Sequence, residues 1–166
     1  MIQRPATLHT LSILAFTLAP ALFLAGCGAG TDLAQRPPPG YVGDVGARVS
    51  AVDWAQARPV TVQLDEFRFQ PDRLAFERGT PYRLTLENRG SVAHTFTSEG
   101  FFKAIAVRRV TTAQGAVETP ALVNLEIPAG QTDVVEFIPV QAGTYDLACH
   151  EPLHSGFGMT GTITVR

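Results

Sequence analysis

The stretch GTYDLACHEPLHSGFGM, residues 143–159, is the part of the sequence that decides which fold to expect. Its first half alternates polar and apolar side chains, which is typical of a β-strand with one buried face. Cys149 continues the apolar side of this alternation, so its side chain is expected to point inward at the end of the strand. The loop that follows contains His154 and Met159 in the spacing Cys-x4-His-x4-Met. This pattern predicts a β-rich domain with its chemistry at one rim.

Similar alternating runs extend upstream and downstream. Their inward-facing members are expected to be Val60, Val62 and Leu64; Phe67 and Phe69; Leu74 and Phe76; Tyr82, Leu84 and Leu86; Val92, His94 and Phe96; Leu125 and Ile127; Val135 and Phe137; and Ile163 and Val165. Gly, Pro and Asn separate the runs, as in an all-β antiparallel sandwich. A one-residue shift of the alternation at Asp65-Glu66 suggests a β-bulge. Residues 101–119 break the pattern and are expected to form a helical or irregular insertion.

Composition limits the class of protein. The 166 residues suffice for one domain with appendages. Apolar residues make up 45% and charged residues 17%, so a buried core is possible and extensive disorder is excluded. The net charge of −2 argues against the concentrated basic surface that a nucleic-acid partner would need.

Residues 1–26 are predicted to be a lipoprotein signal peptide. Their apolar run is about 15 residues long, shorter than the roughly 20 that a membrane-spanning helix needs. The run ends in Leu-Ala-Gly-Cys, which resembles the bacterial lipobox, so Cys27 is expected to carry lipid. The alternative is an ordinary signal peptide with an incidental cysteine. Residues 27–58 are expected to be a lipid-anchored tether rich in Pro and Gly, although 47–58 also fit a short helix or an extra strand, and residues 59–166 to be the folded domain.

Four side chains form a candidate metal site. His94 stands in alternation with the apolar residues Val92 and Phe96, so its side chain is expected to point inward, near Cys149. With His154 and Met159 this gives two imidazoles, a thiolate and a thioether, the donor set of a trigonal copper site with a weak axial ligand. Each residue alone has a simpler explanation: a hydrogen-bonded core histidine, a buried thiol or a core methionine. His150 neighbours the cysteine and is expected to point away from the site.

Other sites fit the sequence less well. A dinuclear copper centre needs two cysteines in the loop, which contains only Cys149. A multicopper oxidase needs several His-x-His pairs, which the sequence lacks. A thioether is a poor fourth ligand for structural zinc. A cysteine protease that paired Cys149 with His154 would leave His94 and Met159 unexplained.

The segments GTYDLAC (143–149) and NRGSVAH (88–94), with His154 and Met159, resemble the cupredoxin family. The ligand spacing is similar to that of rusticyanin and sulfocyanin, and the resemblance covers residues 60–166. It implies a cupredoxin-like Greek-key β-sandwich or barrel of about seven to eight strands that binds one copper ion, Cu(I) or Cu(II). By this resemblance His94, Cys149 and His154 would be the strong equatorial ligands, and Met159 the long axial one.

The chain departs from the family pattern at two places. Thr95 stands where many members have an asparagine that ties the ligand loops together. That hydrogen bond is expected to weaken or to pass to the threonine hydroxyl. Pro152-Leu153 stands where many members have Pro-Gly, which predicts a stiffer and more apolar loop.

The predicted function is that of a single-electron carrier. An enzyme is not expected, because a four-ligand site leaves no open position for a substrate. Pro152, Leu153 and Phe157 are expected to form an apolar patch around His154, where a redox protein such as a c-type cytochrome or a terminal oxidase docks. The alternative is a periplasmic copper chaperone or buffer that delivers copper to an oxidase or serves copper homeostasis. A metal-free adhesion-like sandwich is a third candidate.

The expected location follows from the lipid on Cys27. We expect a monomer that is anchored to a membrane and faces the periplasm or another extracytoplasmic space. Gly28 follows the lipidated residue where an Asp would favour retention at the inner membrane. In a Gram-negative cell the outer membrane is therefore expected.

Overall fold

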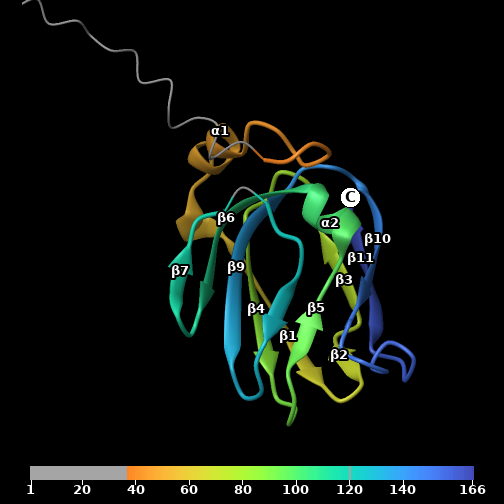
Figure 1. The fold of residues 1–166 in the computed structure, drawn as a ribbon. Helices are drawn as coiled ribbons and strands as arrows, with labels where there is room; N and C mark the ends of the chain where they lie inside the picture. The colour runs from red at the N-terminus through yellow and green to blue at the C-terminus, as the bar shows by residue number, and fades with distance from the viewer. Residues whose placement is uncertain (1–36, 120) are drawn as a thin grey trace, which may run out of the picture.

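The computed structural model describes residues 37–119 and 121–166, which form eleven strands and two short α-helices around an apolar core (Figure 1). The larger sheet has the order β2-β1-β4-β9-β6-β7 and a smaller sheet the order β10-β11-β3, while β5 pairs with β8. The bounds are β1 (Arg58–Asp65), β2 (Arg68–Gln70), β3 (Arg73–Phe76), β4 (Tyr82–Asn88), β5 (His94–Phe96), β6 (Ile105–Thr112), β7 (Gly115–Val117), β8 (Leu125–Ile127), β9 (Thr132–Pro139), β10 (Gly143–Ala148) and β11 (Thr160–Val165). The all-β prediction is confirmed.

Most strand pairs are antiparallel, as the alternation predicts, but two pairs are parallel, β1 with β4 and β11 with β3. Parallel neighbours need a connection that crosses over between them. Here the chain leaves β1, passes through β2 and then β3 in the other sheet, and returns to β4 beside β1. As a result β1 joins the larger sheet and β3 joins the smaller one. The alternation within each strand does not indicate to which sheet the strand belongs.

Aromatic side chains fill the interior between the sheets. The Phe76 and Phe137 rings lie edge to face with centroids 5.2 Å apart, and the Phe101 ring lies 5.5 Å from that of Phe76. In β4 the buried side chains alternate with more exposed ones, and Tyr82, Leu84 and Leu86 point into the core. Each such side chain contributes roughly 1.5–3 kcal/mol on burial. This core gives the loops at its rim a rigid base.

Residues 101–119 are not an irregular insertion, because most of them belong to the larger sheet. A short helix, α2 (Glu99–Lys103), precedes β6, which pairs with β9 and β7. Ile105, Ala106 and Val107 are buried in succession. A strand covered on both faces shows no polar–apolar alternation, which explains why the sequence pattern missed it.

Residues 41–46 pack on the domain and are not part of a tether, and of the alternatives left open for 47–58 the short helix is the one that the structure shows in part. Val42 and Val45, the latter in α1 (Val45–Ser50), are buried with Ala106 on the outer side of the larger sheet. The Tyr41 hydroxyl donates a hydrogen bond of 2.7 Å to the carbonyl of Leu122. A 3-10 turn, η1 (Trp54–Gln56), completes the segment before β1. The predicted signal peptide and Cys27 lie outside the described residues.

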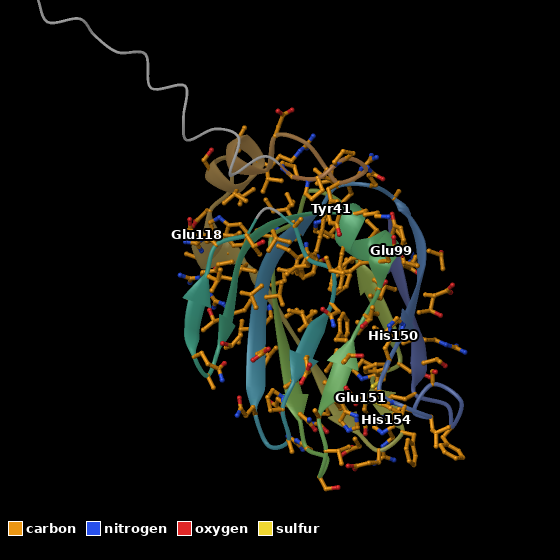
Figure 2. All side chains as sticks on the ribbon, in the orientation of Figure 1. Tyr41, Glu99, Glu118, His150, Glu151 and His154 are labelled. Atoms are coloured by element: carbon orange, nitrogen blue, oxygen red, sulfur yellow. The ribbon has the colours of Figure 1, made fainter. Side chains whose placement is uncertain are left out.

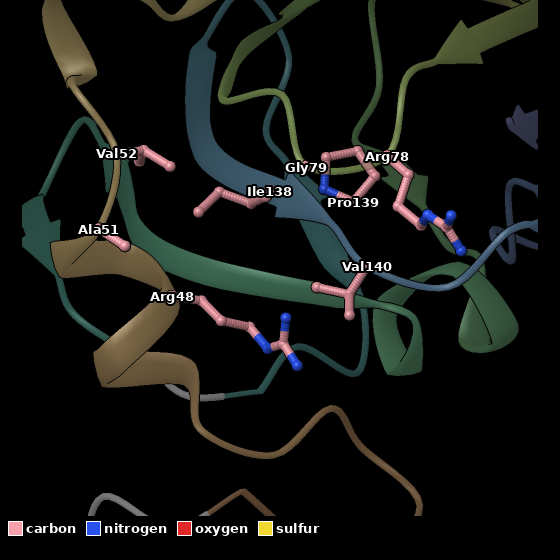
Figure 3. A pocket seen from close by; sticks show the side chains of 8 residues that line it. All are labelled: Arg48, Ala51, Val52, Arg78, Gly79, Ile138, Pro139 and Val140. Atoms are coloured by element: carbon pink, nitrogen blue, oxygen red, sulfur yellow. The ribbon is translucent and has the colours of Figure 1, made fainter.

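The α1 end of the barrel carries a surface pocket against the end of β9, which Figure 3 shows from close by. It is lined by Arg48, Ala51, Val52, Arg78, Gly79, Ile138, Pro139 and Val140. In Figure 2 Tyr41 marks this end, and His154 lies at the opposite end. The chain emerging from residue 37 and the candidate metal residues are therefore on opposite sides of the fold. None of the helices in the described part of the chain has the length and apolar character needed to cross a bilayer.

Candidate metal centre

Strand pairing brings the predicted site residues to one rim. Cys149 directly follows β10, and Met159 directly precedes β11, its antiparallel partner. The loop that holds His154 therefore starts and ends at the same place. A bridge between Thr97 and Ala148 joins the chain after β5 to the end of β10. Because of that bridge His94, the first residue of β5, lies beside Cys149.

Three donor atoms converge in the interior. The Nδ1 atoms of His94 and His154 are 3.2 Å apart, and the Cys149 Sγ lies 4.0 Å from the first and 3.5 Å from the second. A circle through the three atoms has a radius of about 2.1 Å, which matches metal–imidazole and metal–thiolate bonds of about 2.0–2.3 Å. All three side chains are buried. One metal ion fits at the centre of this triangle.

The protonation of His94 also suits a metal ligand. Burial, together with the neighbouring His154, lowers the pKa of His94 below its usual value. A neutral imidazole has a free lone pair on one ring nitrogen, as metal binding requires. Two imidazoles and a sulfur atom that converge in one buried place form a donor set that suits a metal cation.

Backbone hydrogen bonds fix the conformation of the loop between Cys149 and Met159. The N–H of His154 donates to the carbonyl of Glu151 (3.1 Å), and the N–H of Met159 donates to that of His154 (3.0 Å). The N–H of Cys149 donates to the carbonyl of Met159 (3.0 Å). Met159 is fully buried directly beside the cysteine in the ladder. The loop geometry thus brings the fourth predicted residue to the same rim.

Thr95 takes the position predicted for a loop-tying residue. Its hydroxyl accepts a 2.7 Å hydrogen bond from the N–H of His150, and its own N–H lies 3.3 Å from the Cys149 sulfur. The hydrogen bond between the ligand loops has therefore passed to the hydroxyl, one of the two expected outcomes. The His150 side chain is exposed, as the alternation predicts.

Asn88 is a positioning residue that the sequence pattern did not identify. Its buried side-chain amide donates 2.8 Å hydrogen bonds to the carbonyls of Val92 and Ile127, and its oxygen accepts one from the N–H of Gly90. These bonds fasten the turn before His94 to the neighbouring β8. An asparagine at a strand end is an ordinary turn signal, so its tertiary partners could not be deduced locally.

The surface above His154 is apolar. Leu153 is 73% exposed and Phe157 64% exposed, and Pro152 is also exposed. Phe67, which the alternation placed in the core, is 39% exposed in the turn between β1 and β2. Its ring meets the His154 ring edge to face at 5.0 Å and lies 5.1 Å from the Phe157 ring. The predicted bulge at residues 65–66 is in fact the start of this tight reversal, in which Asp65 pairs with Arg68.

The family match and one curated relative identify the family of the chain, and two solved structures are similar to it. Residues 47–165 match the family of cupredoxin-like domains. The copper-resistant cuproprotein CopI of Rubrivivax gelatinosus is 31% identical over 116 residues, which are 68% of each chain. Among solved structures, auracyanin B is 25% identical with a TM-score of 0.47, over 69% of this chain and 93% of that one. The copper nitrite reductase of Nitrosomonas europaea shares the fold at 15% identity and a TM-score of 0.53, over 71% of this chain and 52% of that one.

The family match spans most of the chain and includes every residue of the converging donor set. The mixed nitrogen and sulfur donors of the buried triangle suit copper. The chain therefore belongs to the cupredoxin family, and its cofactor is copper.

Proposed function

We propose that this protein carries single electrons between redox proteins in the bacterial cell envelope and does not itself catalyse a reaction on a substrate. The observation that carries the proposal is the pairing of a buried donor triangle with an exposed apolar surface directly above His154. The bound copper would supply a one-electron couple, Cu(I)/Cu(II). His94, Cys149 and His154 would hold the ion, and Met159 would supply a fourth, weaker donor.

The protein's contribution is a site that stays in place. Hydrogen bonds from Thr95 and Asn88 and within the loop fix the positions of the segments that carry the donors. Burial keeps water away from them. A site with little freedom to rearrange favours rapid electron exchange, because less nuclear motion accompanies the change of charge.

Optical and paramagnetic resonance spectroscopy of the copper-loaded protein tests the proposal. A strong visible absorption from a copper–thiolate bond is expected, followed by electron exchange when the protein is titrated against c-type cytochromes. A colourless copper complex would contradict the ligand set. A coloured protein that exchanges electrons with no cytochrome or oxidase would contradict the carrier function.

We further propose that Pro152, Leu153 and Phe157 form the docking surface, joined by Phe67. Three of these side chains expose much of their apolar area around the edge of His154. An exposed apolar patch suits a transient partner, which must release after each transfer. A redox protein such as a c-type cytochrome or terminal oxidase would meet the ligand edge there.

Replacing Leu153 with Asp tests the surface. The buried charge should weaken docking and slow electron exchange roughly tenfold, since burial of a leucine contributes about 1.5–3 kcal/mol. The visible spectrum should not change. Val117→Asp is the matched control, because Val117 is 61% exposed on β7, outside this surface. Equal stopped-flow rates for the two variants would refute the docking surface.

Replacing Met159 with Leu tests the axial position. Loss of a thioether donor disfavours the more highly charged ion, so the reduction potential should rise by about 60 mV, a tenfold change in the equilibrium constant. The colour should persist, because the three stronger donors remain. Cyclic voltammetry gives the potential, and a colourless or unshifted variant would contradict an axial role.

A second candidate function is copper handling, as a chaperone, buffer or delivery protein for an oxidase. The observation in its favour is the 31% identity to a protein described as a copper-resistant cuproprotein. The two functions differ in whether the ion leaves. A carrier should retain copper through repeated redox cycles, whereas a chaperone should yield Cu(I) to an acceptor apoprotein within minutes of mixing.

The location remains that proposed from the sequence. Lipid on Cys27 would anchor a monomer to a membrane on its extracytoplasmic side, the outer membrane in a Gram-negative cell. The end of the fold where the described chain begins lies away from His154, which would leave the docking surface free (Figure 2). Mass spectrometry of the membrane-extracted protein would detect the acyl chains.

A further inference from the structure

The turn between β1 and β2 places a carboxylate beside the His94 segment. Glu66 Oε1 accepts hydrogen bonds from the N–H of Ser91 (2.6 Å) and from its hydroxyl (3.0 Å). These bonds link residues 25 positions apart and aim the carboxylate at the segment just before His94. Glu66 is exposed, so the contact is not needed to fill the core.

His94 has a ring nitrogen that the donor triangle does not use. Its Nε2 is buried and has no hydrogen-bond partner among the described residues. This nitrogen and the Glu66 carboxylate lie close to each other beside Gly90. A Cβ atom added to Gly90 would lie 2.6 Å from His94 Nε2 and 2.8 Å from Glu66 Oε1, so both atoms border one small space that only glycine leaves open. The two atoms are therefore no more than about 5.4 Å apart, so the charge of the carboxylate lies close to this nitrogen.

We propose that Glu66 is a positioning residue for the copper site: across Gly90, its carboxylate holds the proton of His94 on Nε2 and so reserves Nδ1 for the ion. A metal-binding histidine generally donates its second ring N–H to an outer partner, which sets the tautomer and the ring orientation. The inference rests on the proposed function, because it takes His94 as a ligand. It assigns to Glu66 a role that no local motif indicates.

The charge of Glu66 has a second consequence. Hydrogen bonds from the backbone of Ser91 and of its own turn, with a smaller effect of nearby His94, lower the pKa of Glu66 to about 2. The carboxylate is therefore ionised throughout the neutral range. A fixed negative charge near the ion favours Cu(II) over Cu(I), although solvent screens a carboxylate this exposed.

The test compares Glu66→Gln with Glu118→Gln in the copper-loaded full chain. The glutamine oxygen can still accept from Ser91, so the turn should persist. Glu118 is also exposed but lies at the far side of the fold (Figure 2). Glu66→Gln should shift the reduction equilibrium about threefold toward Cu(I), or about 30 mV for a one-electron couple, with the visible absorption kept. Glu118→Gln should leave the equilibrium within error of the unmodified protein.

Nitrogen-15 NMR of the metal-free protein tests the positioning role without copper. In the unmodified chain the His94 ring should show the tautomer protonated at Nε2, and in Glu66→Gln a mixture of both tautomers. This inference would be overturned if Glu66→Gln and Glu118→Gln had equal reduction potentials and the His94 tautomer were the same in Glu66→Gln as in the unmodified chain. The proposed electron-carrier function would not be affected by that result. A copper-loaded unmodified protein without the thiolate absorption would instead overturn the proposed function.

Discussion

Replacing Cys149 with Ser should abolish the visible absorption of the copper-loaded protein. The serine hydroxyl stays protonated at neutral pH and cannot supply the soft anionic donor that binds Cu(I) and gives the intense charge-transfer band. The two imidazoles remain 3.2 Å apart, so weak copper binding should survive. The loss in affinity should exceed the roughly 10–100-fold that follows from removing an outer hydrogen-bonding partner. Absorption spectra and competition with a copper chelator measure both effects.

His150→Gln is the matched control for this variant. His150 is the next residue along the chain, but its side chain is exposed, whereas the three donor side chains are buried. Its backbone N–H, which bonds the Thr95 hydroxyl, is unchanged by the substitution. The control should keep full colour. A coloured Cys149→Ser protein, or a colourless His150→Gln protein, would show that the donor set is wrongly assigned.

The local sequence pattern was enough to predict that Cys149 and Met159 lie at the same end of the fold. The alternation in residues 143–149 places Cys149 inward, and the loop spacing returns Met159 to the same end because β10 and β11 pair. Period-2 alternation of this kind depends only on neighbours in sequence. The same holds for the exposure of Leu153 and Phe157, which lie in a loop and not in a strand.

The features that could not be predicted depend on contacts between segments that are distant in the sequence. Ile105 to Val107 lost their alternation because residues 42–45 pack on the outer face of β6. Phe67 was placed in the core because its parity matches Phe69, whereas the chain reverses before it and exposes its ring beside His154. Asn88 bonds Ile127, and Glu66 bonds Ser91, in segments distant in the sequence, so local pattern could not indicate these two contacts.

A carboxylate surrounded by arginines organises the outer face of the larger sheet. Glu136 lies in β9, opposite Arg83 of β4 on one side and Arg109 of β6 on the other. Its buried side chain accepts from Arg83 (2.9 Å) and Arg108 (2.9 Å) and forms an ion pair with Arg109 (2.8 Å). Burial by itself raises the pKa of Glu136, but the arginine hydrogen bonds and charges outweigh it, and the pKa falls below its usual value.

Replacing Glu136 with Gln should destabilise the fold by about 2 kcal/mol, or about 4–8 °C in Tm. The loss is below the roughly 3–5 kcal/mol expected for a fully buried pair, because the three arginines are 29–48% exposed and water can solvate them. The stabilisation by an acid with a lowered pKa is present above about pH 4.3 and is lost as the pH falls through the folded value. Unfolding curves of the two proteins should therefore differ at pH 7 and converge in acid. Glu126→Gln, at an exposed position on β8, should change little at either pH. A Glu136→Gln protein that matches this control at pH 7 would mean that the arginines find equivalent partners in water, and that β4, β9 and β6 are held together by their backbone ladder and apolar face alone.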